Sequence, residues 1–203
     1  TLQLQALLDA IRQREPIDGW LQDEHRGLLS MRGSAGWTPL VYAARHGNAR
    51  ATAFLLEAGV DVNQGTQYGD TPLYFACTQG HTKCAELLLG AGASVDLANE
   101  FGQTPLYFAC VHGHIQCAQL LSSHGANRTF PNGSTAESIS AIYGHTALTE
   151  WLVLSREWSP LHHLEVLSPE RTRALLRGGA DLHLSPSTGD TATPLERARQ
   201  LAP

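Results

Sequence analysis

The sequence predicts an all-α solenoid in which similar helical hairpins stack side by side, and two observations support this fold class. Residues 71–93 and 104–126 match at 15 of 23 positions, and the two copies begin 33 residues apart. A fixed period of this length is typical of stacked supersecondary units. Each copy also has an apolar helical pattern on either side of a glycine, so one copy alone cannot bury its apolar face.

The first helix of each unit is expected to follow a Thr-Pro-Leu motif. In the copy that starts at Thr71, the threonine can cap the helix, and Pro72 fits the first turn, where a missing N–H costs nothing. Small and apolar side chains then recur at helical spacing and form the buried face: Leu73, Ala76 and Cys77. Gly80 is expected to end this helix in a left-handed conformation.

The second helix of the same unit is expected to begin after His81. Its buried face would carry three residues at helical spacing: Cys84, Leu87 and Leu88. Gly92 would end the helix as Gly80 ends the first one. One unit is therefore predicted to be a helical hairpin.

The repeated motif resembles the ankyrin repeat, since Thr-Pro-Leu occurs at residues 38–40, 71–73 and 104–106. The resemblance implies a non-enzymatic solenoid that binds a partner protein or linear peptide on its concave surface. The strings at residues 71–77 and 84–89 are also similar to those in the ankyrin arrays of SOCS-box ubiquitin-ligase receptors. A substrate-recognition arm of a ubiquitin ligase therefore stays open as an alternative, and a single lysine, Lys83, against thirteen arginines agrees with it.

One domain, residues 1–203, is expected. Its predicted parts are an N-terminal cap unit at 1–33, repeats at 34–66, 67–99, 100–130, 131–155 and 156–190, and a C-terminal partial repeat at 191–203. The cap would need a polar outer face, for which the sequence offers Gln3, Gln5, Arg12, Gln13, Gln22, Asp23 and Glu24.

Two departures from the repeat pattern predict local changes. Arg14 stands where the other units have glycine. Ser159 follows Thr135 by only 24 residues, so we expect a missing finger and a local distortion between the fourth and fifth units. Pro169 is expected to open the second helix of the fifth unit.

Composition argues against nucleic-acid and membrane partners. The formal net charge is -5, and residues 57–155 hold eight acidic side chains against Lys83 and Arg128. The longest apolar runs fall well short of the roughly 18 residues that span a bilayer. We expect a cytoplasmic protein, or one shared between the cytoplasm and the nucleus.

A metal-dependent enzyme that uses His and Cys residues is the alternative from another functional class. Four cysteines raise it: Cys77, Cys84, Cys110 and Cys117. They recur at 7 and 33 residues because the unit repeats, whereas zinc ligands usually come in pairs two to four residues apart. One short stretch with His162, His163 and Glu165 supplies no fourth ligand. We therefore expect buried thiols, no metal, no cofactor and no small-molecule substrate.

The resemblance places the partner-binding residues on the finger turns before Thr-Pro-Leu and near the ends of the first, inner helices. The finger candidates are Trp37, Tyr68, Asp70, Glu100, Phe101, Gln103 and Asn132. The inner-helix candidates are Arg45, His46, Thr78, Gln79, Val111, His112 and Tyr143. Asn63 matches the position at which ankyrin repeats can be hydroxylated, so it is a candidate modification site.

Tyr68 and Phe101 occupy the same finger position in consecutive units, with Trp37 nearby in the first unit. Aromatic rings with polar neighbours are typical of binding hot spots. The alternative is that each ring folds back over its own finger and stiffens it. Rings one step into the inner helices are expected to pack between adjacent units: Tyr42, Phe75 and Phe108.

The acidic side chains between Glu57 and Glu100 indicate the chemistry of the partner. A segment that combines Arg or Lys with an apolar residue would complement them. Ordinary solubility charge is the alternative, and the salt dependence of the affinity separates the two.

Overall fold

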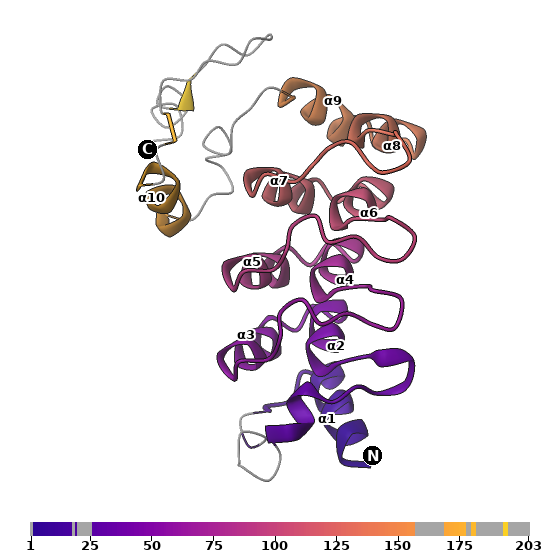
Figure 1. Ribbon diagram of the computed structural model, residues 1–203, viewed down its shortest axis with the longest axis vertical. Helices are drawn as coiled ribbons and strands as arrows, with labels where there is room; N and C mark the ends of the chain where they lie inside the picture. Colours follow the sequence, from indigo (N-terminus) through magenta and orange to yellow (C-terminus); the bar gives the residue numbers. More distant parts are fainter. Residues whose placement is uncertain are drawn as a thin grey trace.

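The computed structural model describes residues 2–17, 19, 26–156, 169–177, 180–181 and 193–194. From α1 to α9, helices follow one another in sequence order along one elongated array (Figure 1). Residues 26–156 contain no β-strand, only an isolated antiparallel bridge between Thr129 and Thr135. The predicted all-α solenoid is confirmed.

Four hairpins make up the described repeats. The inner helices are α2 (Pro39–Arg45), α4 (Pro72–Thr78), α6 (Pro105–His112) and α8 (Ala136–Ile142). The outer helices are α3 (Ala49–Glu57), α5 (Thr82–Gly90), α7 (Ile115–Ser123) and α9 (Thr146–Leu154). Each inner helix packs against the next inner helix, and α5 packs against both α3 and α7. Figure 1 shows the inner and outer helices as two columns, with the finger turns extending from the inner column.

The N-terminal segment packs on the first repeat through α1 (Leu2–Gln13). Leu7 and Ile11 are fully buried, and in the 33-residue register they stand at the positions of Leu40 and Ala44 in the first repeat. Arg14 has a φ of 60°, so it adopts the left-handed conformation that glycine adopts in the other units. Short 3-10 helices, η2 (Arg26–Ser30) and η3 (Ser34–Gly36), follow before α2.

The inner helices begin as their capping residues predict. The Oγ1 atoms of Thr38, Thr71 and Thr104 each accept a hydrogen bond from the backbone N–H three residues later, at 3.2, 3.1 and 3.3 Å. In the fourth unit, which lacks the proline, Thr135 and Ser138 form a reciprocal capping box. The threonine signal therefore places the helix start with or without the proline.

The core is one continuous cluster of small and aliphatic side chains. Ala76, Cys77 and Leu88 are fully buried, as predicted. Leu87 is the exception: we predicted it on the buried face of α5, but it is only partly buried. It lies one position before Leu88, and helix geometry turns the side chain by about 100° per residue, toward the edge of that face.

Histidine and glycine pair across neighbouring units. Gly80 is left-handed, with a φ of 72°, and a Cβ atom built there would lie 2.6 Å from the ring of His114. The same ring donates from Nε2 to the backbone oxygen of Thr78 at 3.1 Å. His81 and His145 bond in the same way to the carbonyl groups near the ends of α2 and α6. These rings satisfy carbonyl groups that a helix end leaves open.

The C-terminal part is described only in pieces. The helix predicted to open at Pro169 is α10 (Pro169–Arg177). The predicted missing finger falls on residues 157–168, outside the described residues, as do His162, His163 and Glu165. The same holds for most of the partial repeat at 191–203 and for three of the predicted polar cap residues, Gln22, Asp23 and Glu24. Among the helices that are described, none has the length and apolar character needed to cross a membrane.

Candidate partner-binding surface

Backbone hydrogen bonds hold the fingers in register. The N–H of Gln67 donates to the carbonyl oxygen of Ala35 at 3.2 Å, and the N–H of Glu100 donates to that of Tyr68 at 3.0 Å. Side chains add to this, since Asn99 Nδ2 donates to Asp70 Oδ1 at 2.8 Å. Consecutive fingers therefore present equivalent positions as one ordered row.

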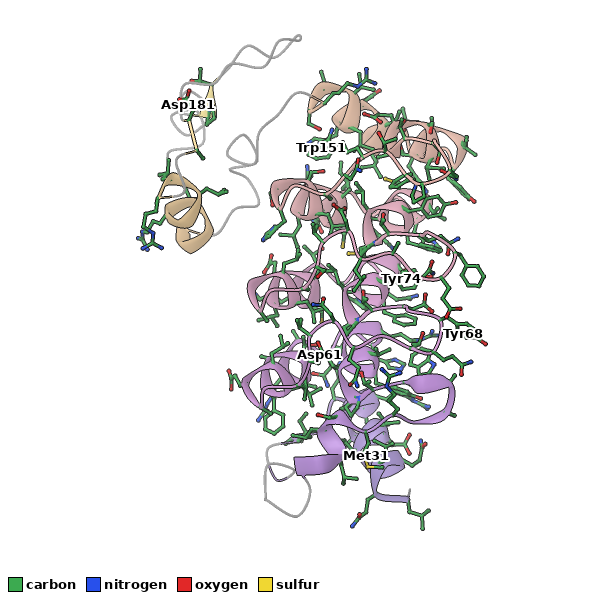
Figure 2. All side chains as sticks on the ribbon, viewed as in Figure 1. Met31, Asp61, Tyr68, Tyr74, Trp151 and Asp181 are labelled. Atoms are coloured by element: carbon green, nitrogen blue, oxygen red, sulfur yellow. The ribbon has the colours of Figure 1, made fainter. Side chains whose placement is uncertain are left out.

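Tyr68 and Phe101 are both exposed to solvent. Their exposed fractions are 46% and 72%, which are high for aromatic side chains in a folded domain. Figure 2 shows Tyr68 on the finger side of the array, away from the outer helices. Because their backbones are joined through the bond from Glu100 to Tyr68, the two rings sit on adjacent, fixed fingers.

Trp37 belongs to a different group of rings. Its centroid lies 5.4 Å from that of Tyr42 and 4.9 Å from that of Phe75, and the Arg45 guanidinium carbon lies 5.0 Å from the indole centroid. Trp37 is therefore packed over the inner helices, whereas Tyr68 and Phe101 are on the fingers.

The expected packing of rings between adjacent units is confirmed for Phe75 and Phe108. The Phe75 ring lies 4.9 Å from Trp37 of the first repeat, and the Phe108 ring lies 4.9 Å from Tyr74 of the second. Tyr42 instead contacts Trp37 and His46 of its own repeat. The pKa of Tyr74 is raised to about 12, mainly by burial and secondly by the nearby carboxylate of Asp70. These rings form part of the contact between units.

Several polar candidates take part in hydrogen bonds that shape the array. Asp70 accepts from Asn99, Gln103 Oε1 accepts from the same amide at 3.2 Å, and Thr78 Oγ1 donates to the Tyr74 carbonyl at 2.8 Å. Asn132 Oδ1 accepts from the backbone N–H of Ser134 at 3.0 Å. The carbonyl oxygen of Val111 accepts from His145 at 2.9 Å. The candidates exposed to solvent are Arg45, Tyr68, Gln79, Glu100, Phe101, His112, Asn132 and Tyr143.

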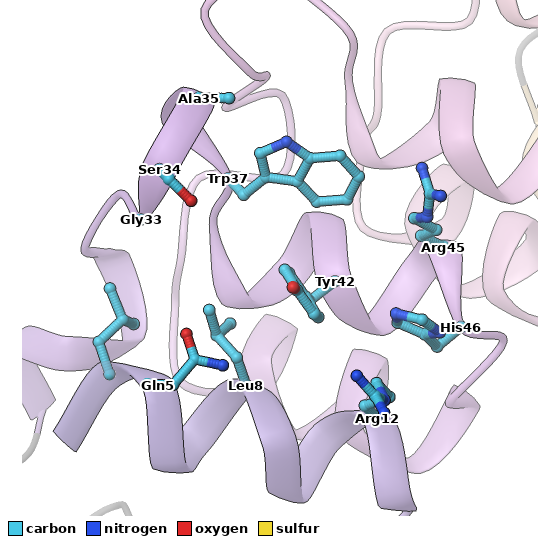
Figure 3. Close-up of a pocket in the computed structure, with 11 residues that line it drawn as sticks. Gln5, Leu8, Arg12, Gly33, Ser34, Ala35, Trp37, Tyr42, Arg45 and His46 are labelled. Carbon is cyan, nitrogen blue, oxygen red and sulfur yellow. The ribbon is translucent and has the colours of Figure 1, made fainter. Parts of the chain in front are cut away.

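A cavity opens between α1, the first finger and α2 (Figure 3). Its volume is about 520 Å³. The lining comprises Leu4, Gln5, Leu8, Arg12, Gly33, Ser34, Ala35, Trp37, Tyr42, Arg45 and His46. It brings together three predicted site residues, Trp37, Arg45 and His46, with side chains of the N-terminal cap that we did not predict as site residues.

The sequence did contain a signal for the missed residues. Leu4, Leu8 and Arg12 recur every four positions, so they share one face of α1. We assigned Gln5 and Arg12 to the polar outer face of the cap, although both line the cavity. Only the packing of α1 on α2 shows which part of that face meets the first finger.

Positive charge dominates the polar part of this cavity. Arg12 and Arg45 are exposed, and among the residues that the structure describes no Asp or Glu lines the cavity. Burial, and then the charges of Arg45, Arg12 and His81, hold the pKa of His46 below its usual value of 6.5. His46 is therefore mainly neutral at pH 7, between two permanent cations.

Replacing Arg12 with glutamine should raise the pKa of His46, because one repelling charge is removed. A pH titration of the His46 ring by NMR measures this directly. The matched control is Arg32→Gln, an exposed arginine outside the cavity lining, which should leave the midpoint unchanged. An unchanged midpoint in Arg12→Gln would mean that this charge does not reach the cavity.

The sign of the associated stability change follows from the same shift. The pKa of His46 is lower in the folded chain than its ordinary value. Its neutral form therefore favours folding above pH 6.5, and this contribution is lost as the pH falls and the ring takes up a proton.

Comparison with known families identifies the fold. A model of three ankyrin repeats matches residues 7–99, and a model of many ankyrin repeats matches residues 77–122. The chain belongs to the ankyrin-repeat family. No curated protein matched the sequence. Ankyrin repeats are generally protein–protein interaction modules, which agrees with the exposed finger rings.

Asn63 lies in the turn after an outer helix of the ankyrin array. Its Oδ1 atom accepts a hydrogen bond from the backbone N–H of Ser94 in the next unit at 2.8 Å. The equivalent hydrogen bond one unit further on runs from the backbone N–H of Asn127 to Asp96 Oδ1, at 3.0 Å. The Asn63 side chain therefore links two repeats, and its hydroxylation stays a prediction.

The four cysteines are free and buried, as predicted. Burial, as the main cause, raises the pKa of Cys77 well above its usual range. It also raises the pKa of Cys110, to about 12. Within the described residues, no group of three or more His, Cys, Asp or Glu side chains could hold a metal ion. The described residues therefore offer no set of metal ligands that would support the alternative of a metal-dependent enzyme.

Proposed function

We propose that this ankyrin-repeat chain binds an extended segment of a partner protein along its fingers and inner helices. One observation supports this most directly: Tyr68 exposes nearly half of its surface and Phe101 most of it, on fingers that are bonded to each other. Rigid aromatic side chains offer large contact area at low entropic cost, and a few such anchors usually carry most of the binding energy.

The partner segment at the second and third fingers is proposed to combine a basic residue with an apolar one. Glu100 is exposed directly beside Phe101, so a cation could bind next to the ring. Asp70 is less available, since its carboxylate already accepts from Asn99. Affinity at these fingers should therefore fall as salt is raised, and an affinity that barely changes would argue against the basic residue.

Replacing both Tyr68 and Phe101 with alanine should weaken partner binding at least tenfold, because two exposed anchors are lost. Quantitative affinity capture from cell extract, compared with the unchanged chain, measures the loss. The fold should be little affected, since both side chains are exposed.

Leu97→Ala is the matched control, because Leu97 is an exposed apolar residue, at 42%, outside the finger positions. It should capture partners as the unchanged chain does. If the double variant keeps full capture while remaining folded, the two rings only stiffen their fingers and the proposal is wrong.

A narrower candidate is a substrate-recognition arm of a ubiquitin ligase. The observation in its favour is that Lys83 is the single lysine; its side chain is 71% exposed and pairs with Glu86 at 2.8 Å. A protein that works beside ubiquitin transfer benefits from few acceptor sites. The test is whether expression of the chain lowers the abundance of a captured partner in a proteasome-dependent manner; a stable partner would contradict this role.

A further inference from the structure

We propose that the cavity between α1 and the first finger binds an acidic side chain of the partner, together with an adjacent apolar side chain. The inference rests on the proposed function, because it assigns the N-terminal end of the same binding surface. It differs from the finger site in charge, since the cavity is lined by arginines rather than flanked by carboxylates.

The inner wall of the cavity is apolar. Leu4 and Leu8 are almost fully buried, at 3% and 4%, and they line the cavity together with Trp37 and Tyr42. Figure 3 shows Leu8, Trp37 and Tyr42 around it. Sites that hold small ligands usually enclose about 300 to 1,000 Å³ and combine apolar walls with a few polar groups. A cavity of about 520 Å³ therefore has room for one large apolar side chain and a neighbouring carboxylate.

Arg45 is held in a position suited to a carboxylate. Its guanidinium carbon lies 5.0 Å from the Trp37 ring centroid and 5.8 Å from that of Phe75. A guanidinium that packs on ring faces keeps N–H groups along its edge, and these can donate two parallel hydrogen bonds to a carboxylate. The packing also reduces the entropy that binding would cost.

Arg12 supplies the second charge from α1. Neither Arg12 nor Arg45 forms an ion pair with any carboxylate in the part of the chain that the structure describes. Asp9 lies on the same helix, but it accepts a hydrogen bond from Gln5 and is not part of the lining. Two cations that pair with no carboxylate of the described residues, above an apolar wall, are complementary to an acidic and apolar segment.

A peptide fits this cavity better than a nucleic acid. The chain carries a net charge of -5, and the fingers that continue the surface carry Asp70 and Glu100. These carboxylates would repel a phosphate backbone, whereas a peptide can place an acidic residue at the cavity and a basic one further along. The proposed ligand is therefore an internal Asp or Glu next to Leu, Ile, Phe or Trp.

The test is selection of random twelve-residue peptides, displayed on phage, against the full chain. Selected sequences should be enriched in an acidic residue beside a large apolar one. Synthetic copies with acetylated and amidated ends should bind the Arg12→Gln, Arg45→Gln variant about two- to thirtyfold more weakly, since each exposed charge pair contributes about 0.2–1 kcal/mol. Adding the peptide to the unchanged chain should also shift the NMR signals of the His46 ring, which does not depend on the variant's folding.

The matched control is Arg173→Gln, Arg177→Gln, which removes the same charge from exposed positions on α10. It should bind the selected peptides as the unchanged chain does. Equal weakening in this control, selected peptides without acidic residues, no selected peptide at all, or an unmoved His46 ring would each overturn the proposal. Binding that requires a free terminal carboxylate would also overturn it.

The two proposals fail separately. If Tyr68→Ala, Phe101→Ala abolishes peptide binding and the two arginine replacements change nothing, the finger site stands and the cavity assignment is wrong. If only the arginine replacements weaken binding, the cavity is the site and the proposed role of the finger rings is wrong.

Discussion

Replacing Gly80 with alanine is expected to lower the free energy of unfolding by about 2–3 kcal/mol. Gly80 has a φ of 72°, and a left-handed alanine costs about 1–2 kcal/mol. Its new Cβ atom would lie 2.6 Å from the His114 ring and displace it, so the bond from His114 to Thr78 would be lost, at a cost of about 1 kcal/mol. Urea unfolding followed by circular dichroism measures the change.

Gly92 provides the control within the same unit. It is also left-handed, with a φ of 89°, but no atom of the described residues lies within 4 Å of the position that a Cβ atom would occupy there. Gly92→Ala should therefore cost only the conformational term, about 1–2 kcal/mol. Equal losses at Gly80 and Gly92 would contradict a specific contact between Gly80 and His114.

A double replacement separates crowding from backbone strain. His114→Ala removes the ring that the new methyl group would meet, so Gly80→Ala should cost less in that background than in the unchanged chain. Strictly additive losses would show that the ring and the glycine act independently.

The contact between glycine and histidine shows what the repeat periodicity can predict and what it cannot. The sequence shows that His81, His114 and His145 follow the glycine between the helices, and the repeat predicts that they share a role. It does not reveal that each ring reaches back to the preceding unit and caps its inner helix. This contact joins residues 34 to 36 positions apart, so a pattern within one unit cannot show it.

Local chemistry explains what was predictable in the fold. Threonine caps, helical spacing of apolar residues and glycine ends act within one unit, and they predicted the inner helices and most of the buried face. The position of Leu87 was not predictable in this way. Leu87 and Leu88 are adjacent in α5, and helical spacing alone does not decide which of the two faces the core more fully.

The proposed binding surface was predictable only in part. The finger position of Tyr68 and Phe101 follows from the register, and both rings are exposed. The cavity was missed because it joins α1 to residues of the first finger and α2. A charged side chain such as Arg12 is as common on a solvent-exposed helix face as in a binding cavity. The sequence alone could therefore not place Arg12 in the same cavity as Arg45.

The two ends of the proposed binding surface have opposite charge, which affects the choice of partner and its orientation. A segment that is acidic toward α1 and basic toward the third finger would be attracted in one orientation and repelled in the other. Charge placement of this kind sets the direction of binding more than its strength. The Arg12 and Arg45 replacements should therefore alter partner choice as well as affinity.

Leu88→Ala is expected to lower the free energy of unfolding by about 3 kcal/mol, because a fully buried leucine is truncated in a close-packed core. Leu88 lies in α5, which packs against α4, α3 and α7. A cavity there weakens contacts within the unit and with both neighbours, and in a repeat array such interface terms add to the stability of the whole. Thermal and urea unfolding measure the loss.

Leu87→Ala is the matched control in the same helix, since it removes the same atoms from a side chain that is only partly buried. Its cost should be about 1 kcal/mol, in proportion to the smaller apolar area that it withdraws from water. Equal losses at the two positions would mean that Leu87 is as deeply buried in solution as the helical spacing first predicted. A large loss at Leu88 alone would instead show that Leu88, and not Leu87, lies in the core of the array.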